Sequence, residues 1–287
     1  KAKVEKFASN RRLLGPDGKV LHVRFSKCAN PKIRALPEGV IDPYVRLLSF
    51  WHDNKPLAIL SYYATHPQSY YGRGGVSPDT VGIARQIRAK KIPEAVHIHF
   101  TGAGANVAAG KYNDGSKENR AILASRLASG MESAWKTTRK TSLRPEHIEW
   151  KTKSVVLPLR DMYQDVSVME NVLKDPRAGT SSRIRAARNI AWAQRVKAKD
   201  PILLSCLRLG RESILHFPGE LFVEYQLAAQ KLRPNDFVAM AAYGDYAPGY
   251  IGDAISYTQG GYETGSVSRV GPEVENVLMD ALKELLK

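Results

Sequence analysis

The stretch Leu57-Ala58-Ile59-Leu60-Ser61-Tyr62-Tyr63-Ala64-Thr65-His66-Pro67 joins an apolar β-type segment to a polar loop that contains glycine. Residues 57–63 have the composition of a buried strand, and Pro67 restricts the backbone just after that strand ends. Ligands in open α/β sheets collect at the carboxyl ends of strands, so His66 is a candidate metal ligand. The alternative is a loop histidine that only forms hydrogen bonds.

A second apolar segment, Ile214-Leu215-His216-Phe217, leads through a Pro-Gly turn to Glu220. Glu220 stands where an amphipathic stretch over residues 221–232 begins. A carboxylate in that position either complements the positive end of a helix dipole or serves as a ligand. The loop from Tyr243 to Tyr262 follows, with further tyrosines at positions 246, 250 and 257. Tyrosine-rich loops either pack internally or form a surface of the kind that contacts carbohydrate.

Strand-like and helix-like segments alternate along the chain. They predict an α/β fold with a mixed β-sheet flanked by helices, in one domain over residues 1–287. The expected strands are residues 45–51, 57–63, 96–100, 148–157, 203–209, 212–217 and 237–241. The expected helices are residues 80–90, 117–138, 168–173, 182–198, 221–231 and 273–286. Asn54 predicts a hairpin between the first two strands, residues 160–183 predict an insertion, and the first forty residues are irregular.

Composition limits the class of partner. The chain has 43 Lys and Arg against 28 Asp and Glu, a net charge of +15. Basic clusters at residues 85–91, 136–140 and 183–199 coincide with helical apolar spacing, which places most of these charges on solvated helix faces. We therefore expect a small polar or anionic substrate and no nucleic-acid partner. No apolar run reaches 18 residues, so no membrane span is expected, and two cysteines define no disulfide framework.

Residues 101–115 read Thr-Gly-Ala-Gly-Ala-Asn-Val-Ala-Ala-Gly-Lys-Tyr-Asn-Asp-Gly, between a predicted strand and a predicted helix. Small residues in such a loop let backbone amides approach a ligand closely. The pattern is not a Walker loop, because Lys111 has no Ser or Thr after it, and it is not a dinucleotide fingerprint. We expect Gly104, Lys111, Tyr112 and Asp79 to take part in substrate binding.

The order of the motifs resembles the amidase domain of the neutral/alkaline non-lysosomal ceramidases over residues 45–286. The motifs are Ala64-Thr65-His66, Ser77-Pro78-Asp79-Thr80-Val81-Gly82, the loop 101–115, Pro218-Gly219-Glu220 and residues 250–272. Members of this family are zinc amidohydrolases whose metal is held by two histidines, a glutamate and a tyrosine. The resemblance implies that His66, Glu220 and Tyr257 bind Zn²⁺ or another divalent metal. It also implies a secreted or periplasmic enzyme.

Three positions depart from the family pattern. The family's first histidine has no counterpart before His66, so we expect the C-terminal portion of a larger catalytic domain, or one chain of a two-part protein. An upstream chain or a longer precursor would then complete the site, and a homo-oligomer is a separate expectation. Ala108 stands at the position matching a family serine, and a family tyrosine falls near Arg269. His97 and His99 alternate along a strand, share one face, and are a rival source of the missing ligand.

These residues predict a metal-dependent hydrolase that cleaves an amide or ester with a metal-activated water. Asn106 is expected to orient the carbonyl oxygen, Asp79 to orient a ligand, and Arg269 to bind a substrate anion, with Tyr262 also at the reaction centre. Asp79 and Asn106 equally suit helix capping and turn closure. Two other functions stay open. One is a carbohydrate-active lyase or glycosidase-like enzyme using tyrosine and histidine acid–base chemistry, and the other is a non-catalytic binding relative.

Overall fold

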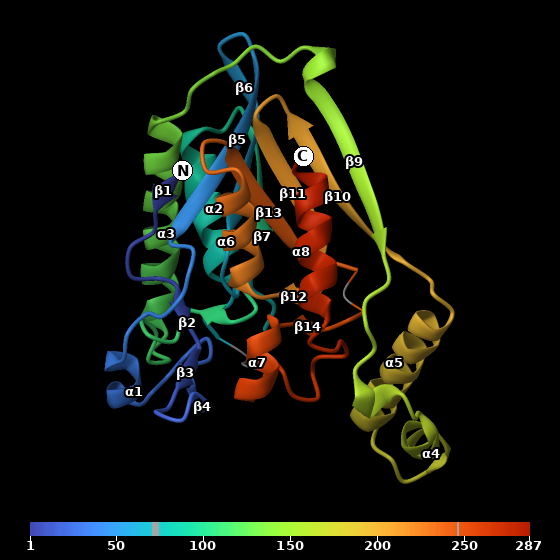
Figure 1. Ribbon diagram of the computed structural model, residues 1–287. Helices are drawn as coiled ribbons and strands as arrows, with labels where there is room; N and C mark the ends of the chain where they lie inside the picture. The colour runs from blue at the N-terminus through green and yellow to red at the C-terminus, as the bar shows by residue number, and fades with distance from the viewer. Residues whose placement is uncertain (71–74, 246) are drawn as a thin grey trace.

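Two four-stranded mixed sheets organise the molecule. The computed structural model describes residues 1–70, 75–245 and 247–287 (Figure 1). The first sheet has the order β1-β5-β6-β7, formed by Ala2–Lys3, Tyr44–His52, Lys55–Tyr63 and Val96–Thr101. The second has the order β13-β11-β10-β9, formed by Phe237–Gly244, Glu212–Pro218, Ile202–Leu209 and Ile148–Val155. The β6–β7 and β11–β13 pairs are parallel, so the predicted α/β class with mixed pairing is confirmed.

Helices cover both sheets, and every predicted helix is present. On the first sheet lie α2 (Asp79–Lys91) and α3 (Glu118–Lys136), and on the second lie α6 (Val223–Leu232) and α8 (Val274–Leu285). α3 forms because Leu123, Leu127 and Met131 recur at four-residue spacing and bury one stripe. The predicted excursion over residues 160–183 contains η2 (Asp161–Tyr163) and α4 (Ser167–Lys174) and leads into α5 (Thr180–Lys197). Figure 1 shows α4 and α5 set apart from the body.

Strand alternation gives each sheet two apolar faces. Tyr62 of β6 and Ile214 of β11 point into one small apolar cluster that both sheets share. The next residues along, Tyr63 and Leu215, point instead into the clusters beneath the helices. This two-residue period buries both faces and explains why these strands are apolar throughout. The predicted hairpin is also confirmed, because β5 and β6 pair antiparallel around a turn at residues 53–54.

Short elements that the sequence did not predict position the candidate site. In the first forty residues, β2 (Ser9–Asn10) pairs with β8 (Val107–Ala108), and β3 (Arg12–Leu14) pairs with β4 (Val20–Val23). Later in the chain, β12 (Glu220–Leu221) pairs in parallel with β14 (Tyr250–Ile251). The remaining short elements are α1 (Pro31–Ala35), η1 (Pro145–His147) and α7 (Ala254–Gln259). These pairings bring segments far apart in sequence to the carboxyl ends of β6 and β11.

Among the helices that the structure describes, none is both long and apolar enough to cross a membrane. Cys28 and Cys206 are both free thiols, so no disulfide joins them.

Candidate metal and substrate site

His66 lies three residues beyond the end of β6, with its ring fixed by two backbone carbonyls. Its Nδ1 is 2.9 Å from the Gly104 carbonyl oxygen and 3.0 Å from that of Val107. A carbonyl oxygen only accepts hydrogen bonds, so Nδ1 carries the proton. Gly104 is required there, because a Cβ would lie 2.5 Å from the backbone nitrogen of Thr65. The Nε2 atom of His66 is left to face the other side chains of the site, as it does in metal-binding histidines.

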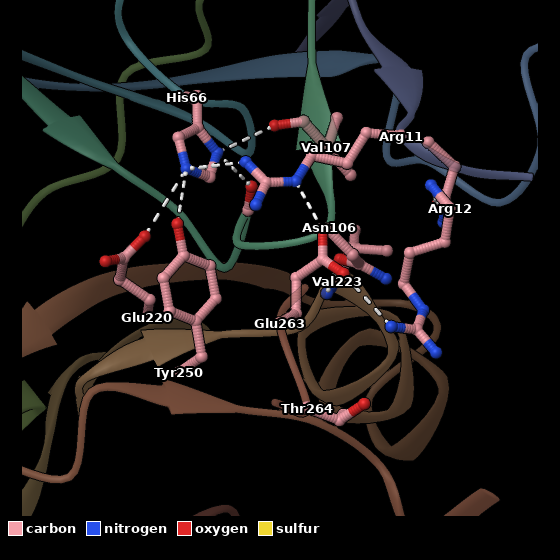
Figure 2. Close-up of polar contacts among 12 residues, drawn as sticks. Arg11, Arg12, His66, Asn106, Val107, Glu220, Val223, Tyr250, Glu263 and Thr264 are labelled. Carbon is pink, nitrogen blue, oxygen red and sulfur yellow. Dashed lines mark hydrogen bonds and ion pairs between the residues drawn. The ribbon is translucent and has the colours of Figure 1, made fainter. Parts of the chain in front are cut away.

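Glu220 and Tyr250 converge on that Nε2 atom (Figure 2). They are direct register partners in the β12–β14 pair, so their side chains emerge together. The Glu220 Oε2 atom is 3.3 Å from His66 Nε2, and the Tyr250 hydroxyl is 3.2 Å from it. The tight turn before Glu220 needs Gly219, which has φ of +60° and would place a Cβ 2.5 Å from the Gly249 carbonyl oxygen. Burial raises the pKa of Tyr250, and Glu220 adds to that rise against the opposing effect of Arg11.

Arg11 brings a cation to the same place. Its Nη1 lies 3.1 Å from His66 Nε2, and its Nε donates to Glu263 at 2.5 Å. Glu263 is fully buried and also pairs with Arg12 at 3.0 Å, as Figure 2 shows. Burial lowers the pKa of the Arg11 guanidinium, but Glu263 and Tyr250 outweigh it and the net shift is upward. The cation is therefore permanent.

Arg11 also retains an unused donor. Its buried Nη2 atom has no hydrogen-bond partner among the described residues. The guanidinium lies 5.2 Å from the ring centroid of Phe25 and 5.5 Å from those of Tyr250 and Tyr262. A buried N–H without an acceptor costs about 1–3 kcal/mol, so this arrangement suits a ligand oxygen that arrives at the site.

The donor set fits a divalent cation. With a proton on Nδ1, the Nε2 atom of His66 faces the Glu220 carboxylate at 3.3 Å, and a cation between two such ligand atoms would be attracted by both. Zinc bonds of about 2.0–2.2 Å in a tetrahedron put neighbouring ligand atoms roughly 3.3 Å apart. The separations of 3.2 and 3.3 Å match that edge. Arg11 Nη1 approaches the same lone pair and would have to move aside.

These groups line a large cleft with a volume of about 1280 Å³. Phe25, Lys27, Pro67 and Tyr262 continue the wall from the loops near His66, and Ser181, Ile184, Arg185 and Arg188 contribute from α5. The cleft is large enough for a drug-sized molecule, and Arg11, Glu220 and Tyr250 place polar groups around His66 in its wall.

The structure brings together two of the three residues predicted to bind metal. His66 and Glu220 meet, but the phenol beside them belongs to Tyr250 and not to Tyr257. The Tyr257 hydroxyl instead lies 3.1 Å from Ser268 Oγ, its ring packs against the second-sheet core, and burial raises its pKa. Tyr246 lies outside the described residues. Among the residues described, no three His, Cys, Asp or Glu side chains gather as a metal site, and the third polar group beside His66 and Glu220 is the phenol of Tyr250.

Asn106 and Asp79 both form hydrogen bonds within the protein. The Asn106 amide donates to Glu224 at 2.8 Å and accepts from the backbone of Val223 at 2.9 Å, which holds the first turn of α6. Asp79 accepts from Ser69 and from the Thr80 backbone, and it ties the loop before α2. Asp79 is the first residue of α2, whose N-cap is Pro78 with no side-chain cap bond, and Asn106 bonds to α6 and not within its own loop, so the capping and turn-closing roles take a different form from those expected.

Lys111 and Tyr112 point away from His66 toward the segment around α1. The Lys111 ammonium donates to backbone carbonyls of Arg34 and Ala35, and the Tyr112 hydroxyl bonds to Glu38. Neither residue lines the cleft. Ala108, at the position matched to the family serine, is buried in β8 opposite Ser9.

Tyr262 and Arg269 do line the cleft, as expected for residues near a substrate. Arg269 donates through Nε to Asn189 at 2.7 Å and through Nη1 to the Ala247 carbonyl at 3.1 Å. His97 and His99, the alternative source of the missing metal ligand, do not line this cleft. His97 bonds to the Ile92 carbonyl at 3.1 Å and His99 to Ser61 Oγ at 2.9 Å, on the face of β7 beneath α2.

No protein-family model and no curated protein sequence matches this chain. Its fold is similar to two solved structures, the neutral ceramidase from Pseudomonas aeruginosa and a ceramidase complexed with C2. Both are 16% identical over 99% of this chain, with TM-scores of 0.67 and 0.68. The fold is that of neutral ceramidases. The chain spans about half the length of those ceramidases, covering 50% and 52% of them.

Local sequence patterns did not predict Arg11 as a residue of this site, nor a role for Tyr250. Arg11 sits in the segment that appeared irregular, and only the β2–β8 pairing carries it to His66. Tyr250 is brought to His66 by the β12–β14 pairing, in which it is the register partner of Glu220.

Proposed function

We propose that this protein is a metal-dependent hydrolase that cleaves an amide in the cleft around His66, giving a carboxylic acid and an amine. The observation that carries the proposal is the convergence of Glu220 and Tyr250 on the Nε2 atom of a His66 ring whose Nδ1 is fixed by carbonyls. The likeness of the fold to neutral ceramidases supports the hydrolase class. Zinc as the metal, an amide as the substrate and secretion are part of the proposal.

The proposal gives each residue a distinct task. His66, Glu220 and Tyr250 would hold the cation, and the rise in the Tyr250 pKa means that this phenol keeps its proton until a cation displaces it. When bound, a divalent cation supplies Lewis-acid chemistry, namely polarisation of the carbonyl and activation of water. The unpartnered Nη2 atom of Arg11 would donate to the oxygen of the scissile carbonyl. Glu263 would hold the Arg11 guanidinium beside the site once its Nη1 atom had moved off His66 Nε2.

The ligand assignment is tested by two matched tyrosine variants. In Tyr250→Phe we expect zinc affinity to fall at least about tenfold, because one donor is removed while the ring is kept. In Tyr257→Phe, which removes a buried hydroxyl from the same segment, we expect unchanged affinity. The measurement is zinc titration against a competing chelator, with circular dichroism to confirm folding. Equal affinities in the two variants, or a wild-type chain that binds no zinc, would contradict the proposal.

A substrate screen tests the reaction itself. We expect zinc-dependent release of amine from N-acyl amino acids and acyl anilides, and Arg11→Lys should slow that release because lysine cannot present a second planar N–H donor. Hydrolysis of polysaccharides without amide cleavage would favour the carbohydrate-active alternative. A folded, zinc-loaded protein that cleaves neither class would leave a binding function.

A further inference from the structure

One wall of the cleft is a basic helix face. α5 contributes Ser181, Ile184, Arg185 and Arg188 to the cleft, at positions i, i+3, i+4 and i+7. This spacing places all four on one side of the helix. Arg185 and Arg188 are exposed to solvent, and the first turn of α5 carries no acidic residue.

The charge of the cleft is strongly unbalanced. Its lining side chains include five cations but one carboxylate, that of Glu220 beside His66. The cations are Arg11, Lys27, Arg185, Arg188 and Arg269. Within the part of the chain that the structure describes, no Asp or Glu lies within ion-pair distance of Arg185 or Arg188. Their positive field therefore acts on whatever enters the cleft.

The helix that carries these arginines is firmly attached to the site. The Trp192 indole donates to the Arg269 carbonyl at 3.1 Å, and Asn189 accepts from the Arg269 guanidinium at 2.7 Å. Trp192 and Ala193 are buried in the second-sheet core. Because the helix is anchored next to a cleft residue, binding an anion would not require α5 itself to be ordered first.

We propose that the cleft selects amide substrates that carry an anionic group, and that Arg185 and Arg188 bind that group. The anion is a carboxylate or a group of similar charge and planar or tetrahedral oxygen geometry, which arginine can bind through paired N–H donors. The amide part of this inference rests on the proposed function, but the anion preference does not. A neutral amide of the same shape would leave the positive field of α5 without a partner in the cleft.

The test uses a charged and a neutral probe of the same shape, dansyl-glutamate and dansyl-glutamine amide. Their binding is measured by fluorescence anisotropy at low salt, once with a chelator and once with zinc. We expect dansyl-glutamate to bind about 25-fold more tightly, since two cations near the anion are each expected to add about fivefold in a solvated setting and the two factors multiply. Raising the salt to 0.5 M should largely remove the preference.

Two double variants separate position from charge. Arg185→Gln/Arg188→Gln removes the proposed recognition pair, and we expect its preference for dansyl-glutamate to disappear. Lys174→Gln/Arg183→Gln removes the same charge from exposed positions of α4 and α5 that do not line the cleft, and we expect it to keep the preference. Glutamine is a good helix former, so both variants should fold, which circular dichroism checks.

The outcomes distinguish this proposal from the proposed function. No preference in the wild type, or the same preference in the first double variant, would overturn the anion proposal even if amides are hydrolysed. A preference that depends on Arg185 and Arg188 would support it even if no amide is cleaved. If the first variant loses binding to phosphatidylserine vesicles but keeps its affinity for dansyl-glutamate, α5 instead faces a membrane surface and the proposal fails.

Discussion

Histidines lie both in the cleft around His66 and on the helix-covered face of β7, but the surroundings of the histidines differ sharply between the two places. In the cleft, His66 Nε2 faces Arg11, Glu220 and Tyr250 within 3.3 Å, in a space of about 1280 Å³. Beneath α2, His97 lines a space of only about 10 Å³. Its neighbour His99 bonds to Ser61, and burial lowers the pKa of His99 to about 4.

The difference shows what marks a site as opposed to a packed core. Burial, with a smaller contribution from the charge of Arg85, lowers the pKa of His99 to about 4, so His99 is neutral at pH 7 and forms an ordinary hydrogen bond. Around His66, buried charges are retained because each has a partner, and Arg11 keeps one donor unused. Retained charge beside open space indicates function, since a protein that needed only stability would gain little from such pairs.

The largest effect should come from Glu263→Gln. Glu263 is the buried carboxylate between Arg11 and Arg12, and without it two buried guanidinium groups lose their partner. We expect the free energy of unfolding to fall by about 3–5 kcal/mol. Urea denaturation monitored by fluorescence would measure it.

The matched control lies on α3, one of the helices that cover the first sheet. Glu132 of α3 also pairs with two cations, Arg88 and Lys136, but its own side chain is exposed. Glu132→Gln should therefore change stability far less than Glu263→Gln. Similar losses in the two variants would remove the energetic contrast between the cleft and the helix-covered face.

The next, smaller effect is on zinc affinity, which should depend on His66 and not on His99. In His66→Ala we expect zinc affinity to fall at least about a hundredfold, because the imidazole is the donor at the centre of the cluster. His99→Leu should bind zinc as the wild type does. Elemental mass spectrometry after gel filtration in zinc would measure both. If His99→Leu lost zinc while His66→Ala kept it, the metal site would lie at β7 and not in the cleft.

Sequence patterns predicted the regular elements well but only part of the site. Apolar alternation and helical spacing are local, so β5 to β13 and α2 to α8 were foreseen to within a few residues, apart from the short elements. His66 and Glu220 were found because each directly follows an apolar strand. Arg11 depends on the two-residue pairing of β2 with β8, a contact almost a hundred residues apart that carries no local signal.

Tyr250 shows a second reason why the sequence predicted only part of the site. Spacing along the family pattern favoured Tyr257, yet Tyr257 lies in α7 and its hydroxyl is used by Ser268, whereas Tyr250 is register partner of Glu220. Both tyrosines belong to the same tyrosine-rich stretch of sequence, and it is the strand pairing that distinguishes them. The internal hydrogen bonds of Asn106 and Asp79 were equally hard to foresee, because an amide or carboxylate at a loop end suits a backbone contact or a ligand equally well.

The smallest effect concerns pH and again contrasts the two regions. The His99 pKa of about 4 in the folded protein lies below the value of about 6.5 in an unfolded chain, so between these values the unfolded state binds more protons. Stability from this residue is present above pH 6.5 and is lost as the pH falls toward 4. From pH 7 to pH 5 we expect the wild type to lose about 1–2 kcal/mol more than His99→Leu. Equal losses in the two proteins would show that His99 charges freely in the fold, and the distinction drawn from burial beneath α2 would fail.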